Sequence, residues 1–328
     1  MLREEIEEKE KTEKREMKKG YAAAIFFSVL VGFSFMGIKV AQTSTDSLGV
    51  LVYRYDFAFA AMIILMLFRV IKIDIKGKPK KKLLTTAAFY VGFMALQVTG
   101  LVFATSVEGS IYFALVPIIV KIIASIFLGE NSSWLENCFV CLTVAALVVM
   151  LAMGSTGISF SPAGAVLLLA SSVSMALSNV FMRYTRNDYK PIETTFTIVL
   201  MGFIAFNAAW IIRGVAEGQG IAEYFLPLTD MKVFIACGYL GIGCILLSAH
   251  LMSYMLSKME AVKGTIFGNV STAISIVAGV VILGEPLMWY HIVCTILIIA
   301  GVVGLSLSGS GGKSGKGEKN EADISHGK

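Results

Sequence analysis

The sequence has few charges where an ordinary soluble protein would have many. Charged residues make up 16% of the chain and hydrophobic residues 56%, which is far from the balance of a soluble globular domain. A soluble chain of 328 residues can bury a large core, but it does not need apolar runs of about twenty residues repeated along its length. The composition therefore excludes an ordinary soluble domain and predicts an all-α protein that crosses a membrane.

Residues that hold metals or cofactors are also scarce. The five cysteines all fall in apolar runs, so the pair Cys138 and Cys141 is expected to serve helix packing rather than zinc or redox chemistry. The three histidines are too scattered for a metal site, and no phosphate-cradling loop is present. The basic residues cluster between apolar runs, which argues against nucleic-acid binding. We therefore expect no cofactor, no metal, no catalytic residue and no direct use of ATP.

The apolar runs predict ten membrane-spanning helices. Residues 1–19 form a charged segment without the features of a cleavable signal peptide, and the Gly-, Ser- and Lys-rich tail 308–328 is expected to be disordered. The predicted spans are residues 20–41, 48–71, 83–105, 109–128, 134–153, 162–183, 192–213, 232–256, 264–283 and 289–307.

An internal duplication divides these spans into two groups of five. The stretch 108–134 returns as 263–289, with Leu128-Gly129-Glu130 matched by Leu283-Gly284-Glu285 and Trp134 matched by Trp289. The predicted repeats are residues 20–153 and 162–307. Because five is odd, the second repeat must enter the membrane upside down relative to the first, an architecture typical of secondary transporters. Glu130 is then expected at the cytoplasmic end of span 4 and Glu285 at the outer end of span 9.

The distribution of Lys and Arg predicts the orientation. Most of the 28 basic residues lie before span 1, in 69–82, in 184–190, in 257–263 and in the tail. The positive-inside rule then places both termini in the cytoplasm of a multi-pass protein of the cytoplasmic membrane.

One face of span 4 is small and polar, as a cavity lining would be. Ser110, Pro117 and Lys121 share this face by helical spacing, and the repeat places Thr265, Asn269 and Thr272 on the matching face of span 9. Lys121 lies deep in the membrane, where a charge is costly. Four interpretations stay open: an amine kept neutral by desolvation, an amine in a wet cavity, an amine that awaits an anionic substrate group, and snorkelling to the surface. The candidate substrate-binding residues are Lys121, His250, Asn269, Gln97, Tyr90, Tyr112, Ser110, Thr265 and Thr272.

Further polar and small residues have other predicted roles. Lys39, Arg54, Asp56 and Glu108 are expected near the outer surface, where Arg54 snorkels, acts in a gate or, as the favoured interpretation, pairs with Glu108. Seams of small residues, such as Ser174 with Ser178 and Gly301 with Gly304, predict helix packing. The candidate bending points are Pro117, Gly238, Gly241 and Gly243.

Several motifs resemble those of the EamA-type transporters of the drug/metabolite transporter superfamily, over residues 20–307. They are VGFSFMGIKVA (31–41), Arg54, SVEGSIYFALVP…LGE ending at Glu130, SSVSMALSNVFMR (171–183) and AVKGTIFGNV…LGEP ending at Pro286. The resemblance implies a ten-helix export carrier for a small metabolite, amino acid or drug, with a cavity lined by spans 3, 4, 8 and 9. The sequence departs from the family pattern at Val31, where tryptophan is usual, at Thr272, where proline is usual, and at Lys121, which suggests a substrate with a negative group.

Together these features predict a secondary transporter that exports amino acids or related small, anionic metabolites by alternating access. Its partners would be a small-molecule substrate and the lipid bilayer, and a monomer is compatible with the sequence. One alternative is a nucleotide-sugar or multidrug carrier of the same fold. A second is a lipid-modifying enzyme, which would need paired carboxylates or a metal cluster at a membrane surface. A receptor or scaffold, the third, would have closely packed helices and no cavity.

Overall fold

The computed structural model describes residues 19–20, 22–75, 78, 80–128, 134–155, 161–218, 220–258, 261–301 and 303–304. Within these ranges the backbone forms helices joined by short connections and contains no β-strand, so the predicted all-α class is confirmed. The predicted N-terminal segment, apart from Lys19, and the tail 308–328 lie outside the described residues, as does Glu130.

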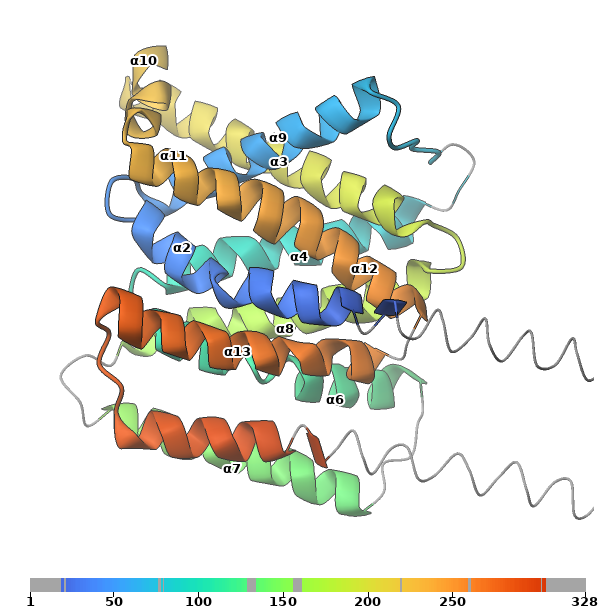
Figure 1. The fold of residues 1–328 in the computed structure, drawn as a ribbon, viewed down its shortest axis with the longest axis vertical. Coiled ribbons are helices and arrows are strands. Elements are labelled where there is room, and N and C mark those ends of the chain that lie inside the picture. Colours follow the sequence, from blue (N-terminus) through green and yellow to red (C-terminus); the bar gives the residue numbers. More distant parts are fainter. Residues whose placement is uncertain are drawn as a thin grey trace, which may run out of the picture.

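Figure 1 shows the order of the helices along the chain. An apolar helical segment, Ala22–Ala41, opens the fold, and a helix over Trp289–Gly301 follows α13. The elements are α2 (Ser34–Ala41), α3 (Ser47–Leu67), α4 (Lys80–Gly100), α5 (Ser106–Phe113), α6 (Val116–Leu128), α7 (Trp134–Ser155), α8 (Pro162–Thr185), α9 (Pro191–Glu217), α10 (Ile221–Phe225), the 3₁₀ turn η1 (Leu226–Thr229), α11 (Met231–Gly238), the π-helix η2 (Tyr239–Leu247), α12 (Ser248–Lys258) and α13 (Ala261–Leu283).

Seven of the described helical segments are long and apolar enough to cross a membrane. Three further apolar helices in the described chain are shorter, and they fall within predicted spans 5, 9 and 10. The long segments are Ala22–Ala41, Ser47–Leu67, Lys80–Gly100, Ser106–Ile123, Pro162–Thr185, Pro191–Glu217 and Met231–Ser257, and the shorter ones are Asn137–Ala146, Val270–Leu283 and Trp289–Gly301.

The helices pack side by side in a layered bundle, with α4 and α8 forming the most extensive pair (Figure 1). This pair is held by cross-helix hydrogen bonds from Ser174 Oγ to the Phe89 carbonyl (2.8 Å) and from Ser178 Oγ to the Thr86 carbonyl (3.1 Å). The predicted packing role of these serines is therefore confirmed. α3 packs on α9 and η2, α2 on α11, and α13 on α5 and α6.

At one margin of the bundle, α7 lies along the Trp289–Gly301 helix (Figure 1). The predicted seam residue Gly301 makes this contact possible, because a Cβ there would lie 2.2 Å from the Thr143 hydroxyl. A Cβ at Gly304 would likewise lie 2.3 Å from the Phe139 ring. Small residues allow helices to approach closely in lipid, so the predicted packing role of both glycines is confirmed.

Two membrane segments depart from a continuous α-helix. α5 ends at Phe113 and α6 begins at Val116, so the interruption immediately precedes Pro117, whose ring cannot continue the hydrogen-bond ladder. Between α11 and α12 the backbone widens into the π-helix η2, which includes Gly241 and Gly243. π-helical turns are rare and are frequent at functional sites.

Polar contacts gather at the two ends of the bundle. At one end, which we call the basic end, Lys78 bonds Glu193 at 2.7 Å and Lys82 lies 3.5 Å from Asp188. We call the other end the Glu285 end, because Glu285 lies there against the start of α5. At this end α3 begins after the N-cap Asp46 and α8 after the N-cap Ser161. There Asp46 pairs with Arg213, Ser44 Oγ donates to Asp230 at 2.8 Å, and Tyr53 donates to the Tyr224 carbonyl at 2.8 Å.

Candidate functional site

A small cavity of about 20 Å³, room for about one water molecule, lies between the helices. Its wall combines several aromatic and methionine side chains with a few polar groups, and it is built by helices from both the first half (20–153) and the second half (162–307) of the chain. The lining residues are Phe27, Val31, Ser34, Arg54, Tyr90, Phe93, Met94, Gln97, Phe113, Met175, Cys244 and Ser248.

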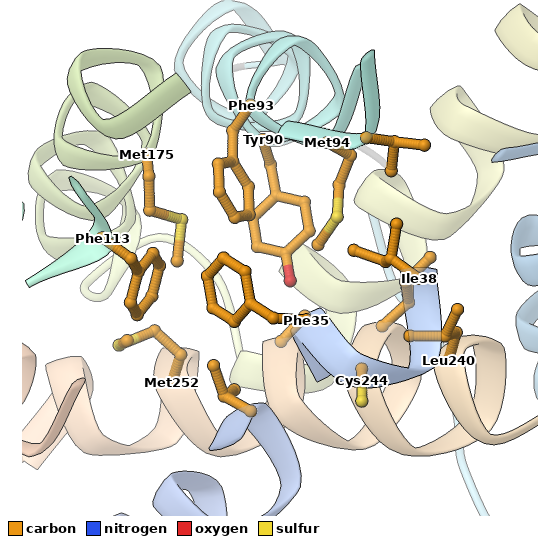
Figure 2. Close-up of a cluster of buried hydrophobic side chains, with 14 of the residues drawn as sticks. Phe35, Ile38, Tyr90, Phe93, Met94, Phe113, Met175, Leu240, Cys244 and Met252 are labelled. Carbon is orange, nitrogen blue, oxygen red and sulfur yellow. The ribbon is translucent and has the colours of Figure 1, made fainter. Parts of the chain in front are cut away.

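Figure 2 shows a cluster of buried hydrophobic side chains that includes apolar residues of this wall, among them Phe93, Met94 and Phe113. Tyr90 and Phe93 point from α4 toward Phe35 of α2, and Phe113 lies on the other side of Phe35. The rings of Phe35 and Phe113 meet edge to face at 5.9 Å, and Phe93 lies 6.1 Å from Phe113. Edge-to-face aromatic contacts of this kind form a well-defined apolar surface.

The cavity contains one buried cation among its lining residues, Arg54. This side chain is 1% exposed, and its Nε and Nη1 atoms have no hydrogen-bond partner among the described residues. A guanidinium inside a membrane costs about 2.5–3.5 kcal/mol or more, and that cost is offset when an anion occupies the site. Arg54 is therefore the strongest available attraction for an anionic ligand in the cavity.

The depth of Arg54 is set by close backbone packing between α3 and η2. A Cβ at Gly241 would lie 2.3 Å from the Arg54 carbonyl oxygen and 2.8 Å from Phe57 Cβ. Only glycine lets η2 approach α3 this closely. On the neighbouring helix α9, a Cβ at Gly202 would lie 2.0 Å from the Tyr55 ring. Glycines on two adjacent elements thus fix the position of α3 at the site.

The other polar groups that line the cavity are neutral. Gln97 is 4% exposed and contributes an amide. The hydroxyl groups of Ser34 and Ser248 donate to carbonyls of their own helices, at 2.7 Å to Val31 and 2.7 Å to Cys244. Ser248 also hydrogen-bonds the side chain of Tyr90, whereas the Ser34 hydroxyl oxygen can still accept a hydrogen bond. A bound molecule would thus meet a cation, an amide, a hydroxyl acceptor and an aromatic wall.

Several predicted substrate-binding residues occupy other places. Tyr90 and Gln97 line the cavity, whereas Ser110, Tyr112 and Thr272 take part in buried bonds between helices. Thr272 Oγ1 donates to the Ser110 carbonyl at 3.0 Å, and Ser172 Oγ donates to the Tyr112 carbonyl at 2.9 Å. The side chains of Thr265 and Asn269 lie outside the described part of the chain.

Lys121 and His250 lie beyond the cavity, toward the basic end. Lys121 is half-buried in α6, about two helical turns after Phe113, and it is not among the lining residues. His250 follows Ser248 in α12 and is half-buried; its Nδ1 atom has no hydrogen-bond partner among the described residues. The structure thus brings Arg54, rather than Lys121, into the central cavity.

The four residues predicted near the outer surface do not bond to one another. Lys39 Nζ donates to the Leu101 carbonyl at 2.5 Å. Asp56 accepts from Asn207 Nδ2 at 2.8 Å and from the Tyr224 hydroxyl. Glu108 accepts from its own N-cap residue, Thr105, as part of a capping box. Arg54 faces the cavity, and Glu108 caps a helix instead of pairing with it.

Glu285, Ser248 and Met175 are functional candidates that the sequence patterns do not predict. Ser248 carries the signal of a polar residue in an apolar span, and Met175 falls between the two seam serines of α8. Glu285 was recognised as part of a repeated motif, but the motif does not say what its carboxylate binds. In the structure this carboxylate accepts hydrogen bonds from Ser106 and Val107 at the start of α5.

The fold is that of a polytopic α-helical membrane protein. A sequence model of the EamA-like transporter family matches residues 18–152 and again 162–307. The chain is 34% identical over 297 residues to the uncharacterized transporter YcxC of Bacillus subtilis, covering 90% of this chain and 95% of that protein. An uncharacterized transporter of Archaeoglobus fulgidus is 24% identical over 277 residues, covering 83% and 92%. This chain therefore belongs to the EamA-like transporter family.

The comparison with solved structures agrees at the level of the fold. One crystal structure superposes with a TM-score of 0.63 at 15% sequence identity, covering 88% of this chain and 97% of that one. The family and the named relatives are all described as transporters.

Proposed function

We propose that this protein is a secondary transporter that exports amino acids or related small anionic metabolites across the cytoplasmic membrane by alternating access. The observation that carries the proposal is the guanidinium of Arg54, buried in a central cavity with unpartnered Nε and Nη1 atoms. A carboxylate is the natural complement of such a group, because guanidinium and carboxylate form paired, charge-assisted hydrogen bonds. The aromatic and methionine wall would hold the rest of the molecule.

The neighbour relations of the helices support two inverted five-helix repeats. If the ten apolar helices are numbered in chain order, the proposed two-fold axis would exchange spans 1–5 with spans 6–10. It maps the pair α4 and α8 onto the pair η2 and α2, and the pair α3 and η2 onto α9 and α4. The pairs α3 with α9 and α5 with α13 map onto themselves. Each of these contacts has its partner, as alternating access requires.

The distribution of basic residues between the two ends of the bundle supports cytoplasmic termini. The contacts of Lys78, Lys82 and Arg183 all lie at the basic end. Cytoplasmic loops carry an excess of Lys and Arg, so the basic end would face the cytoplasm and the Glu285 end the outside. Lys121 and His250 would then lie between the cavity and the cytoplasm, where a lysine could draw an anionic substrate toward Arg54.

The test is binding and transport by wild type and by Arg54→Met in reconstituted vesicles and nanodiscs. Ligands would be amino acids, organic acids, nucleotide sugars and lipophilic amines. We expect wild type to bind a carboxylate-bearing ligand and Arg54→Met to lose at least about 100-fold in affinity, the equivalent of a charge-assisted pair worth about 3 kcal/mol. Because the variant removes an unpaired buried charge, its melting temperature should be unchanged or higher.

Arg213→Met is the matched control, because Arg213 pairs with Asp46 at the exposed margin. It should transport like wild type. Carboxylate binding that survives in Arg54→Met would overturn the anion site, and its loss in Lys121→Met alone would move that site to α6. Binding of lipophilic amines independent of Arg54 would favour the multidrug alternative, and binding of nucleotide sugars alone the nucleotide-sugar alternative.

A further inference from the structure

The carboxylate of Glu285 joins the two halves of the chain at the Glu285 end. It follows α13 in the second half, yet it accepts three hydrogen bonds from the start of α5 in the first half. They come from Ser106 N (2.8 Å), Ser106 Oγ (2.7 Å) and Val107 N (3.0 Å). Ser106 is completely buried, so this carboxylate is the partner that its backbone N–H would otherwise lack.

The Leu-Gly-Glu motif explains how the carboxylate reaches α5. α13 ends at Leu283, and Gly284 adopts a left-handed φ of 67° that turns the chain back. The Glu285 N–H then donates to the Gly279 carbonyl at 3.1 Å. A Cβ at Gly279 would lie 2.6 Å from Ser106 Oγ and 2.7 Å from Glu285 Oε2. Two glycines therefore make room for one carboxylate.

Two carboxylates, one from each half of the chain, accept hydrogen bonds from N–H groups at the start of α5. Glu108 belongs to α5 itself and closes the capping box with Thr105. Glu285 comes from the other half and satisfies the next two N–H groups. The first N–H groups of a helix have no partner within the helix, and the helix dipole favours negative charge there. The hydrogen bonds that Glu285 accepts are thus charge-assisted, and they form only when the two halves of the chain are close together at this end.

We propose that Glu285 is a latch that keeps the Glu285 end of the transporter closed and releases the start of α5 when that end opens. This inference rests on the alternating-access carrier proposed above and adds the contact that holds one of its states. Deeper in the same interface, Thr272 bonds the Ser110 carbonyl at 3.0 Å. A movement about that inner contact separates Glu285 from Ser106 and Val107 first, because they lie farthest from it.

The test uses two reporter cysteines in a background where Cys138, Cys141, Cys237 and Cys294 are replaced. Labelling of the cavity residue Cys244 is measured in that background without the reporters and subtracted. Leu101→Cys reports on the Glu285 end and Met255→Cys on the basic-end side of the cavity, since both positions are completely buried. Labelling by a maleimide is measured on protein in nanodiscs without substrate. In Glu285→Gln we expect labelling at position 101 to rise about tenfold and labelling at 255 to fall, because a charged hydrogen bond is worth at least about a tenfold population shift.

Glu108→Gln is the matched control, because it weakens the same helix start without cutting a contact between the halves. It should change labelling at either position by less than about threefold, as expected for a single local bond. Equal effects of the two variants, or a rise at position 101 without a fall at 255, would mean local fraying and would overturn the latch. The assay needs no ligand, so a failure of the Arg54 site would leave its result unaffected.

Discussion

The two ends of the bundle are held together by different chemistry. At the basic end, the Glu193 carboxylate is 1% exposed, accepts from Lys78 Nζ at 2.7 Å and from Lys190 N at 2.9 Å, and lies close to the Tyr189 ring that packs under Lys78. At the Glu285 end, the exposed ion pair is Arg213 with Asp46, with side chains 33% and 51% exposed. Both sets of contacts join the first half of the chain to the second.

This difference in chemistry suits the basic end to a permanent structural contact and the Glu285 end to a contact that breaks and re-forms. A buried carboxylate with a lysine partner is costly to break, because one charge is left inside the protein. An exposed ion pair contributes little, since water and salt compete with it. At the Glu285 end the strong contact is instead a carboxylate on backbone N–H groups, which water can replace when the end opens. We therefore expect substitutions at the basic end to change stability more, and those at the Glu285 end to change conformation more.

Replacing the buried carboxylate at the basic end should have the largest effect on stability. Glu193→Gln weakens two charge-assisted hydrogen bonds and leaves Lys78 without its counter-charge, so the free energy of unfolding should fall by about 2–3 kcal/mol. Unfolding of the purified protein in mild detergent measures this loss. Arg213→Met, at the other end, should cost only about 0.5 kcal/mol. Equal losses in the two variants would contradict the comparison.

The second-largest expected effect on stability comes from the middle of the bundle, where η2 packs against α3. Gly241→Ala forces a methyl group to within 2.3 Å of the Arg54 carbonyl, and overpacking of this kind costs about 1–3 kcal/mol. Arg54 would also be displaced, so substrate affinity should fall together with the melting temperature.

Gly238→Ala is the control for helix propensity. Nothing lies within 4 Å of a Cβ at position 238, so this variant should be neutral or gain up to about 1 kcal/mol. If Gly241→Ala were as stable as Gly238→Ala, the close approach of η2 to α3 would not be needed. The pair of variants thus tests whether the close packing of η2 on α3 stabilises the protein next to the cavity.

Much of the fold could be predicted because it depends on local patterns. The membrane segments follow from apolar runs of sufficient length, and the seam residues Ser174 and Ser178 follow from helical spacing. The interruption before Pro117 follows from the missing N–H of proline. The clustering of Lys and Arg in a few connecting segments anticipated the basic end. Each of these features is determined by residues close together in the sequence.

The site was harder to predict because it depends on contacts between distant segments. Helical spacing placed Lys121 on the same face as Ser110, but this assumes one continuous helix, and the break between Phe113 and Val116 changes the phase of α6 relative to α5. The depth of Arg54 depends on the close approach of Gly241 and cannot be read from α3 alone. The repeat identified Glu285 but gave no information on its hydrogen-bond donors.

The smallest expected effect is a pH dependence at the Glu285 end. Ser44 Oγ donates to Asp230 Oδ2 at 2.8 Å, and the Lys232 N–H donates to Oδ1 at 2.9 Å. The hydrogen bond from Ser44, followed by that from the Lys232 N–H, lowers the pKa of Asp230 below its ordinary value. A carboxyl group whose pKa is lower in the folded state stabilises the fold above its unfolded pKa, about 4, and loses that contribution as the pH falls through the folded value.

Ser44→Ala should therefore lower the melting temperature slightly at neutral pH. The difference from wild type should shrink as the pH falls below about 4 and vanish only below the lowered pKa of Asp230 in the folded wild type, where the carboxyl group is protonated in both proteins. Thr229→Ala is the control, because its hydroxyl donates to a backbone carbonyl, that of Leu226, which does not titrate. Its effect should not depend on pH. A Ser44→Ala difference that persists unchanged in acid would mean that the bond to Asp230 contributes through geometry alone. In that case the charge of Asp230 would contribute nothing to stability through this exposed contact, whereas the charge of the buried Glu193 is expected to contribute at the basic end.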